Sequence, residues 1–145
     1  MKNLILLIIL VSVTSCTFNN VAINQEADNK DGKAFLNEFY GKINTRDFEG
    51  AEVMIGDSLK KMAGDHGISK MLQFINTKVG NYKSYKIADL YIRSITGNVN
   101  ETSYNYKLKV KYQKGTIDEI IGFKRQNGKS IKINSYHAYS DLLIH

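Results

Sequence analysis

The chain has 145 residues, which is enough for one ordinary domain, and it carries a formal net charge of +6. Lysine supplies most of the positive charge, since the arginines are Arg46, Arg93 and Arg125 alone. Proteins that bind phosphates and read base edges rely on arginine, so we expect no nucleic-acid partner. The single cysteine, Cys16, excludes an internal disulfide.

The start of the chain, MKNLILLIILVSVTSC, has the pattern of a secretory signal. Lys2 provides the positive start, an apolar run extends from Leu4 to Val11, and small residues follow. The apolar run is shorter than the ~20 residues needed to span a bilayer. We therefore expect residues 1–15 to be removed as a signal peptide.

The end of this signal, Val13-Thr14-Ser15-Cys16, resembles the bacterial lipobox. The resemblance implies that Cys16 is lipidated and becomes the first residue, so that its acyl chains hold the protein to a membrane. Thr17 follows the cysteine where some lipoproteins have Asp, which by the same resemblance implies the outer membrane of a bacterial cell envelope, facing the periplasm. The alternative is an ordinary secreted protein with an incidental cysteine.

Residues 16–30 are polar and lack periodicity, which predicts a flexible tether with a reach of ~20 Å after the lipidated cysteine. Residues 31–145 form the predicted domain. Its first half contains three amphipathic segments that predict helices over residues 31–43, 47–55 and 68–80. We expect Asp31 and Asp65 to cap the first and third of these helices.

The second half has the two-residue period of strands, over residues 82–95, 104–112, 116–124 and 129–139. A slip in the apolar pattern predicts a β-bulge near Ala88 and Asp89. In YNYKLKVKY, Tyr106 and Tyr112 share one face and the lysines at 107, 109 and 111 share the other. The Asn127-Gly128 pair predicts a hairpin turn, so the strands form an antiparallel meander.

This α+β pattern resembles the nuclear transport factor 2-like, or cystatin-like, roll: three N-terminal helices packed on a curved four-stranded antiparallel sheet. The likeness is closest to small bacterial lipoproteins of unknown function, which share a helix like that of residues 34–52 and a segment like GNYKSY at residues 80–85. The resemblance implies a conical cavity lined by the inner faces of the strands. It also implies a homodimer formed through the sheet.

The strand periods identify the residues that would line this cavity. Glu119 shares a face with apolar residues in TIDEIIGFK, and the same alternation on the last strand brings His137 to that face. A carboxylate among apolar neighbours acquires a raised pKa, as general acids and bases do. Glu119 and His137 are thus weak catalytic candidates, and the predicted ligand-binding set is Tyr106, Tyr112, Glu119, Ile121, Phe123, Ser135 and His137.

Simpler structural alternatives stand beside these candidates. A bulge would move the last strand by one residue and turn Tyr136 inward, and Glu119 could pair with a lysine of YNYKLKVKY. Those lysines predict either a solvated outer sheet face or a contact with anionic lipid. The histidines lack the paired spacing of a metal site, so we expect neither a metal nor another cofactor.

The sequence thus favours a membrane-anchored envelope lipoprotein whose domain binds a small ligand or a protein partner without catalysis. One alternative is a cavity enzyme of the isomerase or dehydratase type that uses Glu119 and His137. Another is a structural or assembly factor of the envelope with a filled cavity. Fold likeness alone does not choose among these functions.

Overall fold

The structure is a computed structural model and describes residues 19–144. The predicted signal peptide and Cys16 lie outside the described residues. The elements follow in the order β1 (Asn20–Ile23), α1 (Glu26–Asn44), α2 (Phe48–Val53), α3 (Asp57–Ala63), α4 (Gly67–Val79), β2 (Tyr82–Thr96), β3 (Glu101–Tyr112), β4 (Thr116–Gln126), β5 (Lys132–Tyr139) and the 3-10 turn η1 (Asp141–Leu143).

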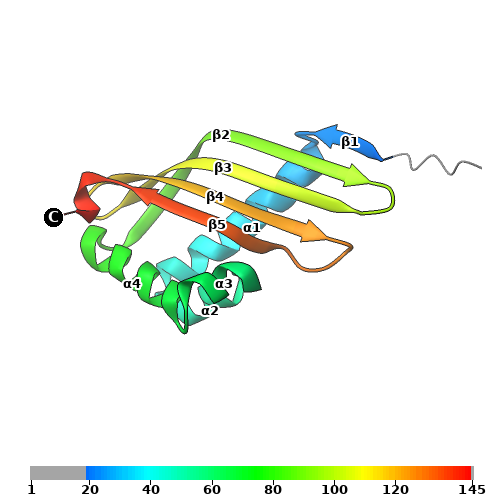
Figure 1. Cartoon of the computed structure of the whole chain (residues 1–145). Helices are drawn as coiled ribbons and strands as arrows, with labels where there is room; N and C mark the ends of the chain where they lie inside the picture. The colour runs from blue at the N-terminus through cyan, green and yellow to red at the C-terminus, as the bar shows by residue number, and fades with distance from the viewer. Residues whose placement is uncertain (1–18, 145) are drawn as a thin grey trace, which may run out of the picture.

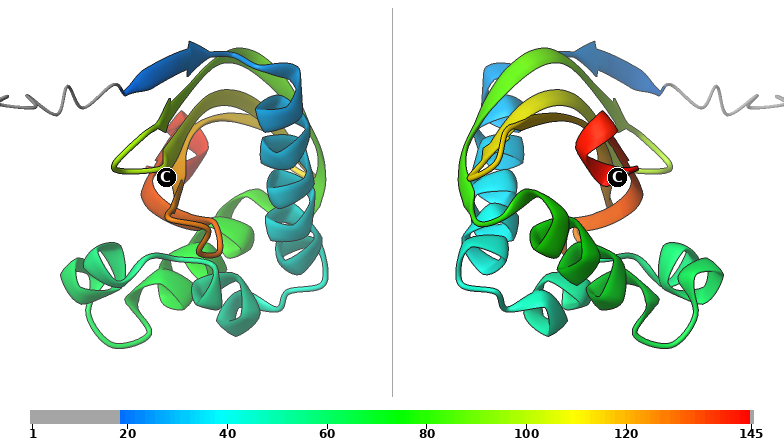
Figure 2. Two further views of the ribbon diagram at one scale, coloured as in Figure 1. Left: turned by 90° about the vertical axis from the view of Figure 1, so that its right-hand side faces the viewer. Right: turned by 90° about the vertical axis from the view of Figure 1, so that its left-hand side faces the viewer.

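The five strands form one open antiparallel sheet in the order β1-β2-β3-β4-β5. Figure 1 shows all four helices of the described residues on one side of this sheet, which leaves the opposite face without a helix. In Figure 2 the sheet curves around α1, and the shorter helices lie beyond the C-terminal part of α1. The α+β class and the antiparallel meander are therefore as the sequence predicts.

The counts of strands and helices differ from the prediction. We predicted four strands and three helices, whereas β1 is a fifth strand and α3 is a fourth helix. Residues 20–23 form β1 and α1 begins at Glu26, so most of the segment that we predicted as a flexible tether is folded. Helix α3 lies in the glycine-containing loop after α2 and has no buried residue.

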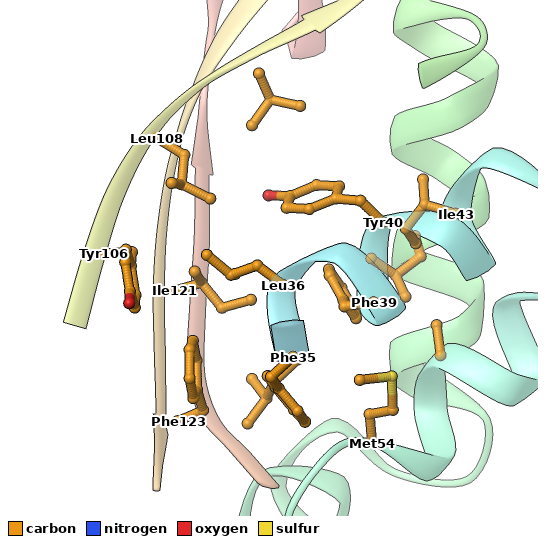
Figure 3. Close-up of a cluster of buried hydrophobic side chains, with 14 of the residues drawn as sticks. Phe35, Leu36, Phe39, Tyr40, Ile43, Met54, Tyr106, Leu108, Ile121 and Phe123 are labelled. Atoms are coloured by element: carbon orange, nitrogen blue, oxygen red, sulfur yellow. The ribbon is translucent and has the colours of Figure 1, made fainter. Parts of the chain in front are cut away.

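Helix α1 packs on the concave face of the sheet through one apolar stripe. Its buried side chains are Phe35, Leu36, Phe39, Tyr40 and Ile43. Figure 3 shows Leu36 and Tyr40 directed at side chains of the strands, among them Leu108 and Ile121. The stripe recurs every three or four residues, so all five side chains lie on one side of the helix.

A glycine allows α1 to approach β3 closely. A Cβ atom at Gly32 would lie 2.3 Å from the Tyr106 hydroxyl and 3.0 Å from the Tyr104 ring. Gly41, in the same helix, has nothing within 4 Å of the corresponding position. The close contact with the sheet therefore depends on the missing side chain at Gly32.

Both predicted helix caps, Asp31 and Asp65, are wrong. Asp31 lies inside α1, which begins at Glu26, and its carboxylate accepts a hydrogen bond from Arg125 on β4 at 3.0 Å. At α4 the N-cap residue is His66, and Glu52 of α2 accepts from the backbone N–H of Ser69 at 3.2 Å. A side chain from a neighbouring helix thus satisfies the donor that we assigned to Asp65.

The sheet contains the predicted bulge and two register shifts that we did not predict, one of them at Lys83 near the start of β2. Between β2 and β3 the register shifts at Ala88, where the slip in the apolar pattern placed a bulge. Between β4 and β5 the register shifts again, because Gly122 pairs with Ser135 whereas Phe123 pairs with Ile133. Asn134 is the extra residue, and it turns the remainder of β5 over by one position.

Candidate functional site

Glu119 is the only charged residue among the fully buried side chains of the described part of the chain. It lies on β4 with 0% exposure, between Leu108 of β3 and Ala138 of β5 in the register of the sheet. The predicted face is confirmed, because Ile117, Ile121 and Phe123 are buried on the same side. The predicted alternative of a cross-strand pair with a lysine is wrong, since the lysines of β3 are on the other face.

Tyrosine hydroxyls from other elements surround the carboxylate. Tyr40 of α1 donates to Oε2 at 2.7 Å, and Tyr112 of β3 donates to Oε1 at 2.8 Å. A side-chain hydrogen bond from Tyr136 of β5 acts on the same group. We call Glu119, Tyr40, Tyr112 and Tyr136 the Glu119 cluster. It links α1 and three elements of the sheet through one buried polar group.

The buried position changes the proton affinity of every member of the cluster. Burial raises the pKa of Glu119, while the hydrogen bonds from the three tyrosines act in the opposite direction and leave a net increase. Burial and the neighbouring carboxylate raise the pKa of Tyr40 and of Tyr136 well above the usual value. The pKa of Tyr112 is raised for the same reasons. At neutral pH the tyrosines are therefore neutral donors.

Aromatic rings close the space around the cluster. The Tyr82 ring stacks on Tyr40 with centroids 5.1 Å apart and meets Tyr112 edge-on at 6.1 Å. Deeper along the sheet, Phe123 stacks between Tyr104 and Tyr106, with centroids 4.8 and 5.6 Å away. Side chains thus occupy the space where the resemblance implied a conical cavity, and Figure 3 shows several of them between α1 and the strands.

The surface depressions lie elsewhere. One, between α1 and the β4–β5 hairpin, is lined by Asp31, Phe35 and Arg125 among others. Another is lined by Lys124, Lys129 and Lys132 with the start of α3. Glu119 lines neither of these two depressions, and its side chain is fully buried. The cluster can hold elements together, but it lacks the access that a substrate requires.

The predicted catalytic pair is wrong. The bulge at Asn134 places His137 opposite Ile120, on the exposed outer face of the sheet. Glu119 faces inward, so the two side chains lie on opposite sides of the sheet. Tyr136 takes the inner position that we assigned to His137, which is the alternative that a one-residue slip predicted.

The other predicted ligand-binding residues fall into two groups. Tyr106, Tyr112, Ile121 and Phe123 face inward as predicted, but they are packed in the core at 3% exposure or less. Ser135 lies beside the bulge and pairs with Gly122. Sequence periodicity identified the inner face correctly, whereas it could not show that other side chains fill the space in front of it.

A cluster with metal-ligand chemistry was missed at the start of α4. Donor atoms of Glu49, Glu52 and His66 all lie within 4.8 Å of one another. These groups already have protein partners: His66 Nδ1 lies 3.2 Å from Glu49 Oε2, and Glu52 accepts from Ser69 N. His66 and Glu49 are exposed, and the arrangement serves to join α2 to α4.

The outer face of the sheet combines charged and aromatic side chains. Lys107 pairs with Asp89 at 3.2 Å, and Lys109 pairs with Asp118 at 2.6 Å. Exposed rings lie near both edges of this face, Tyr91 on β2 and Tyr139 on β5, at 49% and 55% exposure. We call this helix-free surface the outer sheet face. The carboxylates reduce the net attraction of its lysine row for anions.

No protein-family model matches the chain, and no curated protein is significantly similar to it. Of the helices in residues 19–144, none is both long enough and apolar enough to cross a membrane.

Proposed function

We propose that this protein is a lipid-anchored envelope lipoprotein with a nuclear transport factor 2-like domain that binds a protein partner and catalyses no reaction. The observation that carries the proposal is the closed environment of Glu119. The one buried carboxylate of the described core is surrounded by tyrosine hydroxyls and covered by rings. This arrangement supports a role in fold stability and favours binding at the surface over binding in a cavity.

The outer sheet face is the surface that suits a protein partner best. It is free of helices, and it carries exposed tyrosines with paired charges between them. Tyrosine provides apolar contact area together with a polar group, and it is enriched in protein interfaces. A second copy of the chain would use the same surface, as the resemblance implies for dimers of this fold.

The anchor is supported by the lipobox at Val13–Cys16 and by the absence of any other cysteine in the sequence. Its test is the mass of the N-terminal peptide of protein expressed with its signal in a bacterium that processes lipoproteins. We expect an acylated Cys16 at the N-terminus and a protein in the membrane fraction. Cys16→Ser should release the protein from that fraction. An unmodified Cys16 in soluble protein would contradict the anchor.

The binding surface is tested by photo-crosslinking in the cell. A benzophenone amino acid replaces Tyr91 on the outer sheet face, and Phe74 on α4, which has the same 49% exposure, is the matched control position. We expect a discrete crosslinked species from position 91, with a partner identified by mass, and none from position 74. A species of twice the chain mass would identify a dimer. Equal crosslinking from both positions would contradict this surface assignment.

A further inference from the structure

The first folded element begins very close to the predicted anchor. Strand β1 starts at Asn20, four residues after Cys16. Four residues span at most ~14 Å when fully extended. This is shorter than the ~20 Å tether that the sequence predicted, because residues 20–23 are part of the sheet. A lipidated Cys16 would therefore keep the domain close to the bilayer.

Two hairpin turns lie at the same end of the sheet as the start of β1. Asn20 pairs with Thr96, the last residue of β2, and residues 97–100 form the turn from β2 to β3. The β4–β5 turn is hydrogen-bonded to the β2–β3 turn. Asn127 N donates to the Asn100 carbonyl at 2.7 Å, and Asn100 N donates to Asn127 Oδ1 at 3.3 Å. Figure 1 shows these turns and the start of β1 together, with the C-terminus at the opposite end.

We call the start of β1, turn residues 97–100 and turn residues 127–129 the anchor-proximal end. The side chains exposed at this end are suited to contact with a lipid surface. Val99, at the turn, is 50% exposed, and Val21, on β1, is 52% exposed. Lys129 is exposed on the second turn, and Glu101 beside it is paired with Lys124 at 3.7 Å. Small apolar side chains with a lysine suit the interface between headgroups and acyl chains.

The opposite end of the sheet cannot contact the same bilayer in this orientation. Strand β3 has 12 residues, which corresponds to ~40 Å at the rise of a strand. The β3–β4 turn, with exposed Lys114, lies at the opposite end of this strand from residues 97–100. A headgroup layer is only several ångströms thick. The two ends should therefore differ clearly in their contact with lipid.

We propose that the anchor-proximal end rests on the bilayer surface, with Val99 at the level of the lipid headgroups, so that the outer sheet face stands beside the membrane and stays open to a partner. This inference depends on the proposed acylation of Cys16. It assigns the hairpin turns, rather than the lysine row of β3, as the surface that contacts lipid.

The test uses single thiols in the acylated protein. Because acylation consumes Cys16, a cysteine introduced by Val99→Cys is the only free thiol in the mature chain, and Lys114→Cys is the matched control at the far turn. Each thiol receives an environment-sensitive fluorophore, and the protein is reconstituted into phosphatidylethanolamine–phosphatidylglycerol vesicles. Lipids with a nitroxide on the headgroup then quench any fluorophore at the membrane surface.

We expect several-fold stronger quenching at position 99 than at position 114. Flotation with the vesicles and the mass of Cys16 are measured on the same samples, so failure of the anchor is recognised separately. Acylated, floating protein with equal quenching at the two positions, or with none, would overturn the proposed orientation and leave the anchor intact. Protein that is not acylated would overturn both.

Discussion

Removing the Tyr40 hydroxyl tests the structural role of the Glu119 cluster. The change Tyr40→Phe keeps the ring, which is 1% exposed, and removes the donor that lies 2.7 Å from Glu119 Oε2. A hydrogen bond to a charged or buried acceptor contributes about 1.5–3 kcal/mol when only one partner is removed. Tyr112 and Tyr136 still donate to the carboxyl group, so we expect a loss of about 2 kcal/mol in the free energy of unfolding.

Tyr104→Phe is the matched control for this change. Tyr104 is also fully buried, but its hydroxyl has no hydrogen-bond partner among the described residues. Removing an unpaired buried hydroxyl should leave stability unchanged or raise it slightly. Both variants thus lose a tyrosine hydroxyl from a buried position, and they differ in whether that hydroxyl makes a hydrogen bond.

The assay is urea unfolding followed by far-ultraviolet circular dichroism, since the chain has no tryptophan. Every variant carries Cys16→Ser so that acylation is equal in all of them. We expect the midpoint of Tyr40→Phe to fall with an unchanged dependence on urea, which indicates a change in stability alone. A Tyr40→Phe protein as stable as the parent, or an equal loss in Tyr104→Phe, would refute the reasoning.

Three further predictions concern the same core. Gly32→Ala should destabilise the fold by about 1–3 kcal/mol, because the new Cβ would meet Tyr106. Gly41→Ala, the control in the same helix, should stabilise the fold by up to ~1 kcal/mol. Thermal unfolding compares the two variants, and equal shifts in their melting temperatures would contradict the close approach of α1 to β3. Since the folded-state pKa of Glu119 is raised, its contribution to stability is full below about pH 4 and is lost as the pH rises through that pKa. The stability of the parent relative to Glu119→Gln should therefore decline from about pH 4 upward, and a difference independent of pH would argue against a raised pKa. The raised pKa values of Tyr40, Tyr112 and Tyr136 mean that stability is lost as the pH rises above ~10, so part of the tyrosinate absorbance should appear only together with unfolding. Complete ionisation of the tyrosines in a chain that is still folded would contradict the burial of these three hydroxyl groups.

The periodicity of apolar side chains along the sequence was sufficient to predict most of the fold. The alternation in YNYKLKVKY predicts the buried and exposed faces of β3, and the stripe of Ile68, Leu72, Ile75 and Val79 predicts α4. The slip near Ala88 predicts a bulge that the register contains. In each case a side-chain period is long enough to be read along a single element.

The elements that the sequence did not predict have little periodicity. Strand β1 has four residues, and its residues pair with residues of β2 that lie 70 to 76 positions further along the chain. Helix α3 has no buried residue, so no apolar stripe marks it. Short or largely exposed elements are determined by tertiary contacts, which a pattern along the chain does not contain.

The predicted pairing of Glu119 with His137 is wrong for a related reason. Glu119 was placed on the correct face by the period of β4, but its partner was assigned across a strand whose bulge lies at Asn134. Asn134 and Ser135 are both polar, so the alternation gives no sign of the extra residue. Tyr40 comes from α1, 79 positions from Glu119, and only the folded chain brings the two together.

Side chains fill the space between α1 and the strands, so we expect any partner to bind outside it. Native mass spectrometry of the intact mature protein, purified gently from its own cells, can decide this. We expect the mass of the acylated chain, alone or with a protein partner. A reproducible additional small-molecule mass that is lost when Tyr106 or Phe123 is changed would place a ligand in the core, and the interior would then not be filled by side chains.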